Sequence, residues 1–355
     1  MRIIDSSKPI LVTGAGGYIA SWIIEYLLEK GYSVRGTVRS LAQKERLSHL
    51  EDMAKQYEGR LALFEADLLR HGSFQKAMEG CELVFHTASP FKINGVKDAQ
   101  RELIDPALEG TRNVFLSVEE TPSVKRVVLT SSVAAIFGDA REIEDQPNHT
   151  FTEDAWNLSS NLQHQPYSFS KTLAEKEAWN MVGQQMRWDL IAMNPAFVLG
   201  PSRSRRTDST STGFVRGLLS GSFKSGTAAM YFGVVDVRDV AQAHILAGFT
   251  PAAEGRHILC NETLSMLEMA KILNEAYSGR FALPNREIPK WLLWLMAPKI
   301  GFTRKYVQDN IGFKPLFDNR KAVEQFNLRY RPVRETLLDQ AAQLIQDGLI
   351  KNAQP

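Results

Sequence analysis

The chain contains 355 residues, of which 44% are hydrophobic and 23% are charged, and its formal net charge is +2 at pH 7. These values are ordinary for a globular protein, and they lack the excess of Lys and Arg that binds nucleic acids or anionic membranes. The two distant cysteines, Cys81 and Cys260, match no metal-binding or redox spacing. We therefore expect a cytoplasmic protein that binds no metal, no nucleic acid and no membrane.

Short apolar runs alternate with segments of helical spacing through the first two-thirds of the chain. The apolar runs predict strands at Pro9–Thr13, Ser33–Val38, Leu61–Glu65, Leu83–His86, Val124–Thr130 and Leu190–Met193. The segments between them predict helices at Tyr18–Lys30, Leu41–Tyr57, Phe74–Met78, Ala99–Glu119 and Tyr167–Gln184. This alternation indicates an α/β fold with a doubly wound parallel sheet of the Rossmann type, covered by helices on both faces.

A glycine-rich turn joins the first strand to the first helix in the sequence ILVTGAGGYIAS. Gly14, Gly17 and Ala20 have the spacing G-x-x-G-x-x-A, which permits a tight turn and close approach of the backbone to a pyrophosphate. The amides that begin the helix would then bind the phosphates. The alternative is a tight turn without a ligand, but the position after the first strand favours a dinucleotide site.

The end of the second strand, GTVRS, indicates which dinucleotide is bound. An NAD site would have an acid here to hold the ribose 2′-hydroxyl, whereas this chain has Arg39. Ser40 and Gln43 have the spacing of a capping box, which would begin the next helix at the same point. Arg39, these helix amides and Lys44 suit a 2′-phosphate and so predict NADP(H). The alternative is a solvated surface arginine.

Asp67 follows the third strand in the sequence FEADL. Its carboxylate is placed to accept a hydrogen bond from the adenine amino group, or to cap a helix. The spacing is compatible with both interpretations.

A tyrosine and a lysine begin the helix PYSFSKTLAEKEAW and, being four residues apart, share one face. An ammonium group about 4 Å from the phenol would lower the pKa of Tyr167 by about three units and make it a general acid. Thr130, Ser131 and Ser132 end a strand at the sheet edge where such folds place their sites, so a hydroxyl there could hold a carbonyl oxygen. The structural alternatives are a chance pair on a helix and serines that bind the local backbone.

The pattern changes after residue 200, where PSRSRRTDSTSTG predicts a long polar loop beside the expected site. Arg203, Arg205 and Arg206 in this loop could attract an anionic group. We expect residues 202–212 to be mobile in the empty protein and to become ordered as a partial lid. The alternative is a plain connection.

The rest of the chain divides between two expected domains. Residues 1–200 form the dinucleotide-binding domain, and residues 230–262 return to it with strands at Met230–Val234 and His257–Leu259 and a helix at Val237–Gly248. Residues 201–229 and 263–355 form mainly a smaller substrate-binding lobe, with helices at Met266–Tyr277 and Arg334–Asp347.

Bulky apolar residues of the second lobe are candidates for the wall of an apolar substrate pocket: Phe214, Phe223, Tyr231, Trp291 and Trp294. The run Trp291–Met296, WLLWLM, is too short to cross a bilayer. We expect it to be a buried helix or a pocket wall in preference to a membrane contact.

The motifs above resemble the extended short-chain dehydrogenases/reductases, specifically the branch of dihydroflavonol reductases, cinnamoyl-CoA reductases and aldehyde or ketone reductases. The resemblance extends over nearly the whole chain and rests on VTGAGGYIAS, GYSVRGTVRS, FEADL, GCELVFHTASP, DPALEGTRNV, RVVLTSSVAAIF, PYSFSKTLAEKEAW, NPAFVLGP, VDVRDVAQAH and RPVRETLLDQAAQLIQDGLI. It implies a catalytic triad of Ser132, Tyr167 and Lys171, with Ser131 replacing Ser132 if the register differs by one. Asn113 matches the G-T-x-N-V helix of the wider family, but we assign it a structural role.

The resemblance also implies which residues contact the dinucleotide. Besides Tyr167 and Lys171, which would lie at the nicotinamide ribose, they are Gly14, Gly17, Tyr18, Ile19, Arg39, Lys44, Asp67, Leu68, Thr87, Ala88, Ser89, Thr130, Pro195 and Val198.

The implied activity is NADPH-dependent reduction of an aldehyde or a ketone to the alcohol, with Tyr167 as the proton donor. This chain has HQPYSFSK where cinnamoyl-CoA reductases carry their signature, which favours a free aldehyde or ketone over a CoA thioester. The alternatives are an NAD-dependent nucleotide-sugar epimerase or dehydratase, a 3β-hydroxysteroid dehydrogenase-like enzyme, and a regulator that senses NADPH without turnover. Arg39 argues against the first, and the complete triad argues against the last. The branch includes monomers and homodimers, and the sequence leaves both open.

Overall fold

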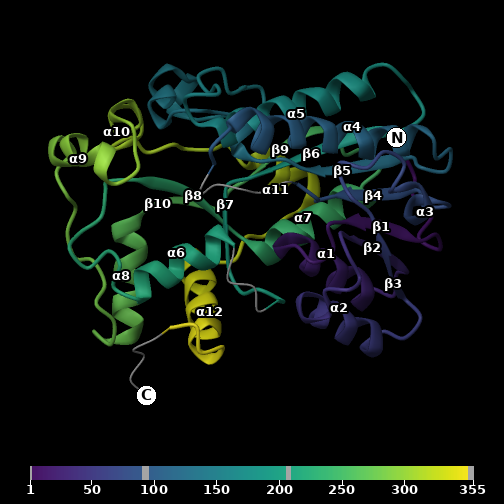
Figure 1. The fold of residues 1–355 in the computed structure, drawn as a ribbon, viewed down its shortest axis with the longest axis horizontal. Helices are drawn as coiled ribbons and strands as arrows, with labels where there is room; N and C mark the ends of the chain where they lie inside the picture. The colour runs from purple at the N-terminus through teal and green to yellow at the C-terminus, as the bar shows by residue number, and fades with distance from the viewer. Residues whose placement is uncertain (1, 90–95, 205–208, 351–355) are drawn as a thin grey trace.

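The computed structural model describes residues 2–89, 96–204 and 209–350. Its main sheet contains seven parallel strands in the order β3-β2-β1-β4-β5-β6-β9 (Figure 1). Their bounds are β1 Ile10–Thr13, β2 Val34–Val38, β3 Leu61–Glu65, β4 Leu83–His86, β5 Arg126–Thr130, β6 Asp189–Pro195 and β9 Gly255–Leu259. The strand order reverses between β1 and β4, which opens a crevice at the carboxyl ends of these strands. The structure confirms the predicted α/β fold.

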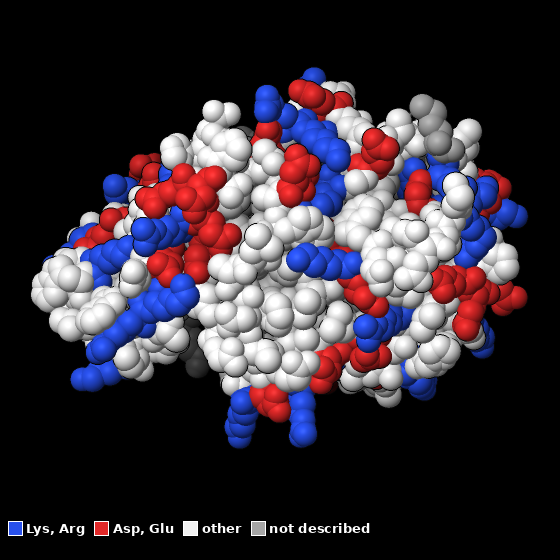
Figure 2. Space-filling view, turned by 90° about the horizontal axis from the view of Figure 1, so that it is seen from above, with Lys and Arg blue, Asp and Glu red and all other residues white. Residues whose placement is uncertain are grey.

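Helices cover both faces of the main sheet. One face is covered by α1 (Tyr18–Glu29), α2 (Lys44–Gln56), α7 (Val237–Phe249) and α11 (Arg320–Phe326), whose apolar residues share one core. The other face is covered by α3 (Gln75–Met78), α4 (Asp105–Glu119) and α5 (Pro166–Val182), which share a second core. A short π-helical segment, 100–104, leads into α4. The face that carries α4 and α5 has basic and acidic side chains interspersed (Figure 2).

A second lobe is built on a small three-stranded sheet in the order β10-β8-β7. The strands are β7 Phe197–Leu199, β8 Tyr231–Asp236 and β10 Glu262–Ser265. Around this sheet pack α6 (Thr210–Leu219), α8 (Met266–Tyr277) and α12 (Val333–Gln346), which contribute to a third core. The shorter helices α9 (Lys290–Met296) and α10 (Arg304–Asn310) lie at the far end of this lobe (Figure 1).

The chain crosses between the two sheets differently from the expectation. Of the two segments expected to return to the main sheet, only β9 pairs there, with β6. β8 instead pairs with β7 and β10 in the second lobe, and the helix that follows it, α7, packs against the main sheet. The predicted loop 201–213 is also shorter than expected, since Ser209 caps the helix that begins at Thr210. Arg205 and Arg206 lie outside the described residues.

The apolar helix α9 corrects another prediction. Leu293 is buried, but Trp291 is 65% exposed and Leu295 is 53% exposed. The run WLLWLM is apolar on every side, and only the side that packs against Val307 and Ile311 of the lobe is covered. The expectation of a buried helix therefore holds for one side of α9 only, because periodicity cannot show how many sides of a helix have neighbours. Within the described ranges, every helix is too short or too polar to cross a membrane.

Candidate active site

The glycine turn forms a tight connection at the carboxyl end of β1. Gly14 has a φ of +66°, and a Cβ there would lie 2.9 Å from Ala88 Cα, at the end of β4. The amide of Gly17 donates to Gly14 O over 2.8 Å, and Gly17 is the N-cap of α1, where no side chain caps the helix. The first amides of α1 therefore face the crevice without a capping side chain, which suits a pyrophosphate.

Substituting the first glycine of the turn tests this geometry. We expect Gly14→Ala to destabilise the protein by about 1–3 kcal/mol, because the new methyl group meets backbone at a left-handed φ. Gly16→Ala is the matched control, since a Cβ at Gly16 meets only the end of the Leu47 side chain at 3.7 Å. Urea unfolding of both variants measures the difference. Equal stability of the two would contradict the assigned turn.

Two cations follow β2 beside the glycine turn. Arg39 and Lys44 are both exposed, and neither has an ion pair or hydrogen bond among the described residues. The loop between them is held by Glu65, whose Oε1 accepts from Leu41 N at 2.7 Å. The predicted capping box is wrong: α2 begins at Lys44, and the hydroxyl of Ser40 accepts from Ala42 N in a local turn. The two cations are thus available to an anion.

Several residues of the predicted dinucleotide site make contacts that shape the crevice. Tyr18 donates its hydroxyl to Gly200 O over 2.5 Å, and Thr87 Oγ1 donates to the carbonyl of Thr13 over 2.5 Å. One carboxylate oxygen of Asp67 accepts from Leu69 N at 2.9 Å, which makes a local turn. The first bond joins α1 to the residue after β7, and the second joins the carboxyl ends of β1 and β4.

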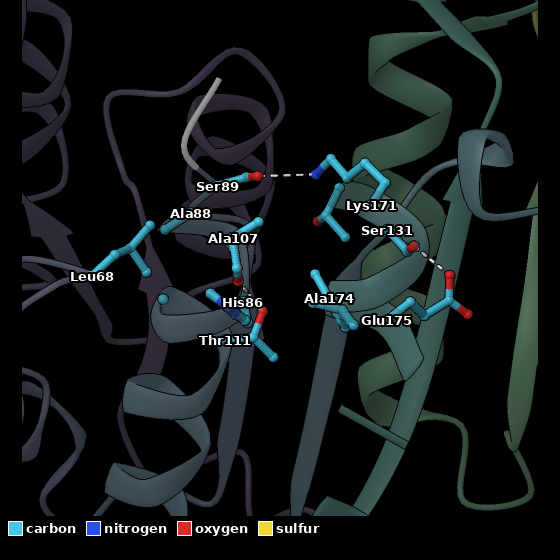
Figure 3. Close-up of a pocket in the computed structure, with 13 residues that line it drawn as sticks. Leu68, His86, Ala88, Ser89, Ala107, Thr111, Ser131, Lys171, Ala174 and Glu175 are labelled. Atoms are coloured by element: carbon cyan, nitrogen blue, oxygen red, sulfur yellow. Dashed lines mark hydrogen bonds between the residues drawn. The ribbon is translucent and has the colours of Figure 1, made fainter. Parts of the chain in front are cut away.

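A pocket lies between α4, α5 and the ends of β4 and β5 (Figure 3). It brings together five residues of the predicted site, which come from four different segments: Leu68, Ala88, Ser89, Thr130 and Lys171. The other residues that line it are His86, Ala107, Gly110, Thr111, Leu129, Ser131, Ala174 and Glu175. The predicted catalytic residue Lys171 therefore shares this pocket with four residues of the predicted cofactor site.

Lys171 points across this pocket from α5. Its Nζ donates to Ser89 Oγ over 3.0 Å (Figure 3). Burial lowers the pKa of Lys171 to about 8, while the carboxylate of Glu175 partly opposes this change. The cation is therefore held at the carboxyl end of β4, within the expected path of the dinucleotide.

Tyr167 lies in the first turn of α5, four residues before Lys171. Burial raises the pKa of Tyr167 well above its usual range. The expected lowering by Lys171 is not seen in this structure, because desolvation of the phenol dominates and the ammonium group is bound to Ser89. A high pKa keeps the phenol protonated, as a proton donor must be at the start of its reaction.

The structure separates the two adjacent serines after β5. Ser131 is buried, and its hydroxyl donates to Glu175 Oε2 (Figure 3). Ser132 is half-buried, and its Oγ accepts from Ala134 N at 3.1 Å. None of the described residues accepts the Ser132 hydroxyl proton, so this proton can be donated to a bound oxygen.

Glu175 is a buried residue that the sequence analysis missed. Its side chain has no exposed area, and it binds Arg256 Nε at 2.6 Å and Asn194 Nδ2 at 2.7 Å, in addition to Ser131. Its position one helical turn after Lys171 was the available signal, because residues four apart share a helix face. Its partners on β6 and β9 are distant in sequence and could not be identified.

The remaining predicted residues are three of the cofactor site, the structural Asn113, and Arg203 of the polar loop. Ile19 belongs to the first turn of α1, Pro195 ends β6, and the carbonyl of Val198 accepts from Ser211 Oγ at 2.5 Å. Asn113 donates to Leu68 O over 2.7 Å, in keeping with the structural role expected for it. Arg203 does not face the crevice: it pairs with Glu25 of α1 and lies over the Trp22 ring.

The aromatic candidates for the substrate pocket also separate. Phe214 and Phe223 pack into the core of the second lobe, and Phe214 contacts the rings of Phe197 and Phe232. Tyr231 begins β8, and Trp291 and Trp294 are exposed on α9. The structure does not gather these five side chains into one pocket.

Comparisons with known proteins agree with this geometry. Residues 10–260 match the model of the NAD dependent epimerase/dehydratase family. The chain is 43% identical over 284 residues to cinnamoyl-CoA reductase CAD2 of Medicago truncatula, covering 79% of this chain and 82% of that protein. It is 34% identical over 357 residues to tetraketide alpha-pyrone reductase 1 of Arabidopsis thaliana, covering 99% of this chain and 100% of that protein. Among solved structures, yeast methylglyoxal/isovaleraldehyde reductase Gre2 complexed with NADPH superposes with a TM-score of 0.77 at 28% identity, covering 96% of this chain and 100% of that one.

Proposed function

The chain belongs to the NAD dependent epimerase/dehydratase family, and we propose that within it the protein is an NADPH-dependent reductase that converts an aldehyde or a ketone to the alcohol. The observation that carries this proposal is the position of Lys171 in the pocket, bound to Ser89 on one side and one turn from Tyr167 on the other. The relatives named above are reductases, which supports the same reaction class.

NADPH is the proposed cofactor. The exposed cations Arg39 and Lys44 have no described partner and follow β2, where the family's NAD-binding members would need an acid. The glycine turn offers the first amides of α1 to the pyrophosphate. The similar Gre2 structure contains NADPH, in agreement with this choice.

The proposed roles follow from the contacts of each side chain. NADPH, when bound, supplies the hydride that adds to the carbonyl carbon. Ser132 donates its hydroxyl to the carbonyl oxygen and orients it, and Tyr167 transfers its phenolic proton to that oxygen as the alcohol forms. Lys171 stabilises the phenolate that remains and holds the nicotinamide ribose. The domain division is part of the proposal: residues 201–229 and 263–355 would provide most of the substrate-binding side.

A second candidate is the reduction of a CoA thioester to the aldehyde. The observation that favours it is the 43% identity to a protein named as a cinnamoyl-CoA reductase. The sequence HQPYSFSK around Tyr167 favours the free carbonyl compound, because it lacks the signature expected of thioester reductases.

A substrate panel distinguishes the two candidates. We expect the purified protein to oxidise NADPH with small aryl or branched aldehydes and α-ketoesters, and to do so much more slowly with cinnamoyl-CoA. Consumption of NADPH with cinnamoyl-CoA alone would establish the second candidate in place of the first. An absence of turnover with every member of the panel would contradict both.

A further inference from the structure

A buried carboxylate outside the pocket gathers donors from two separate segments, residues 164–165 and α10. Asp139 is 4% exposed and precedes a 3-10 helix at Ala140–Asp145. His164 Nε2–H donates to it, lying 2.8 Å from each carboxylate oxygen. Gln165 Nε2 donates to Oδ1 over 2.8 Å, and Asn310 Nδ2 donates to the same oxygen over 2.6 Å. The reaction proposed above uses none of these four residues.

Two of these donors, His164 and Gln165, stand directly before α5. Gln165 is the N-cap of α5, and its side chain does not cap the helix but binds Gly138 O at 2.6 Å and Asp139. Its backbone is left-handed, with a φ of 53°. A non-glycine residue in this conformation is strained by about 1 kcal/mol or more, so outside contacts must hold it. Tyr167 lies two residues further on.

The segment that carries Asp139 is itself held by Glu142 and by the loop 157–160. The carboxylate of Glu142 accepts from Asp139 N at 2.7 Å and from Gly138 N at 3.2 Å. A Cβ at Gly138 would lie 2.0 Å from Ser159 Oγ, so the loop 157–160 packs directly on this glycine. Asp139 is therefore held in place by its own segment and binds Gln165, the N-cap of α5.

The same carboxylate also joins the second lobe to the catalytic helix. Asn310 belongs to α10, and its Oδ1 accepts from Ala140 N at 3.0 Å while its amide group donates to Asp139. Lys305, also on α10, has its Nζ 3.7 Å from Asp139 Oδ2 and 2.6 Å from Asp309. The residue before α5 and the helix α10 are thus both bound to the carboxylate of Asp139.

We propose that Asp139 is a positioning residue for the reduction, which sets the first turn of α5, and with it Tyr167, through the left-handed Gln165. This inference rests on the proposed function, since it assigns Asp139 to the proton donor of that reaction. A displacement of about 1 Å in a reacting group costs about a hundredfold in rate, so loosening this turn affects the chemical step.

Two substitutions test the inference in the full-length protein. Asp139→Asn keeps the shape of the side chain but removes the charge and sets an amide against the donors. Gln165→Ala removes one hydrogen-bonding side chain and leaves the bonds of His164 and Asn310 to Asp139. We expect each substitution to lower the single-turnover rate constant of hydride transfer by about 10- to 100-fold, and to leave the Kd of NADPH unchanged. Glu144→Gln, on the same 3-10 helix but exposed, is the matched control and is expected to keep the wild-type rate.

The decisive measurement combines Asp139→Asn with Tyr167→Phe. If Asp139 acts through the phenol, the pair is strongly non-additive, and adding Asp139→Asn to Tyr167→Phe changes the rate by less than about twofold. Losses that multiply would show a merely structural role and overturn the inference. Full activity of both single variants would overturn it too. Failure of the proposed function looks different, because the wild type itself would then not reduce carbonyl compounds.

Discussion

Replacing Tyr167 with phenylalanine is expected to lower kcat for carbonyl reduction by about 10²–10⁴-fold, which is the range for loss of a positioned general acid. The pKa of Tyr167 is raised by burial, so the phenol carries its proton throughout the neutral pH range. The substitution removes only the hydroxyl group and leaves Lys171 bound to Ser89. The Kd of NADPH should therefore stay within about twofold of the wild-type value, since no proposed cofactor contact with a charge is lost.

Stopped-flow measurement of NADPH oxidation with saturating aldehyde separates this chemical step from product release. Tyr277→Phe, in α8 of the second lobe, is the control for loss of a tyrosine hydroxyl away from the pocket. A Tyr167→Phe variant that retained the wild-type single-turnover rate would remove Tyr167 from the mechanism and leave Ser132 as the remaining hydroxyl donor to the carbonyl oxygen.

The second large effect concerns the cofactor. Arg39→Asp is expected to lower kcat/KM for NADPH relative to NADH by about a hundredfold or more. One charge-assisted hydrogen bond contributes about 1.5–3 kcal/mol, and the new carboxylate adds repulsion against the 2′-phosphate. NADH lacks that phosphate, so its kcat/KM should be unchanged or higher. Arg39 has no partner among the described residues, so the substitution breaks no contact seen in the structure.

Steady-state kinetics with both cofactors provides the ratio directly. Arg280→Asp makes the same change of charge in the second lobe, where it should leave the ratio unchanged. A wild-type protein that used NADH and NADPH equally well, or an Arg39→Asp variant with an unaltered ratio, would show that the 2′-phosphate is recognised elsewhere.

The elements of the first two hundred residues could be predicted because their signals are local. Continuous apolar runs marked the strands, both the fully buried β4 and the edge strand β3, and the bounds predicted for these two strands are the observed ones. The resemblance assigned both Lys171 and Ser89 to the dinucleotide site, but their hydrogen bond to each other was not predicted.

Other features depended on contacts between distant segments. Glu175 binds Arg256 of β9, and Asp139 binds Asn310 of α10; no periodicity in the sequence connects either pair. Burial of the phenol outweighs the attraction of Lys171, and the sequence does not reveal how deeply Tyr167 lies. The exposure of Trp291 could not be predicted for the same reason. The sequence of an apolar helix is the same whether or not other elements pack against each of its sides.

The position of β9 has a consequence for how the chain acquires its structure during synthesis. β9 pairs with β6, with Ile191 opposite Gly255, and the whole of β7, α6, β8 and α7 lies between them. Such a non-local pairing forms slowly, because the entropy of closing a long loop is lost before the stabilising contacts form. Until β9 emerges from the ribosome, β6 presents an open hydrogen-bonding edge of apolar residues, which is an aggregation site. We therefore expect the nascent chain to be most prone to aggregation after β6 has been made and before residue 259 is available.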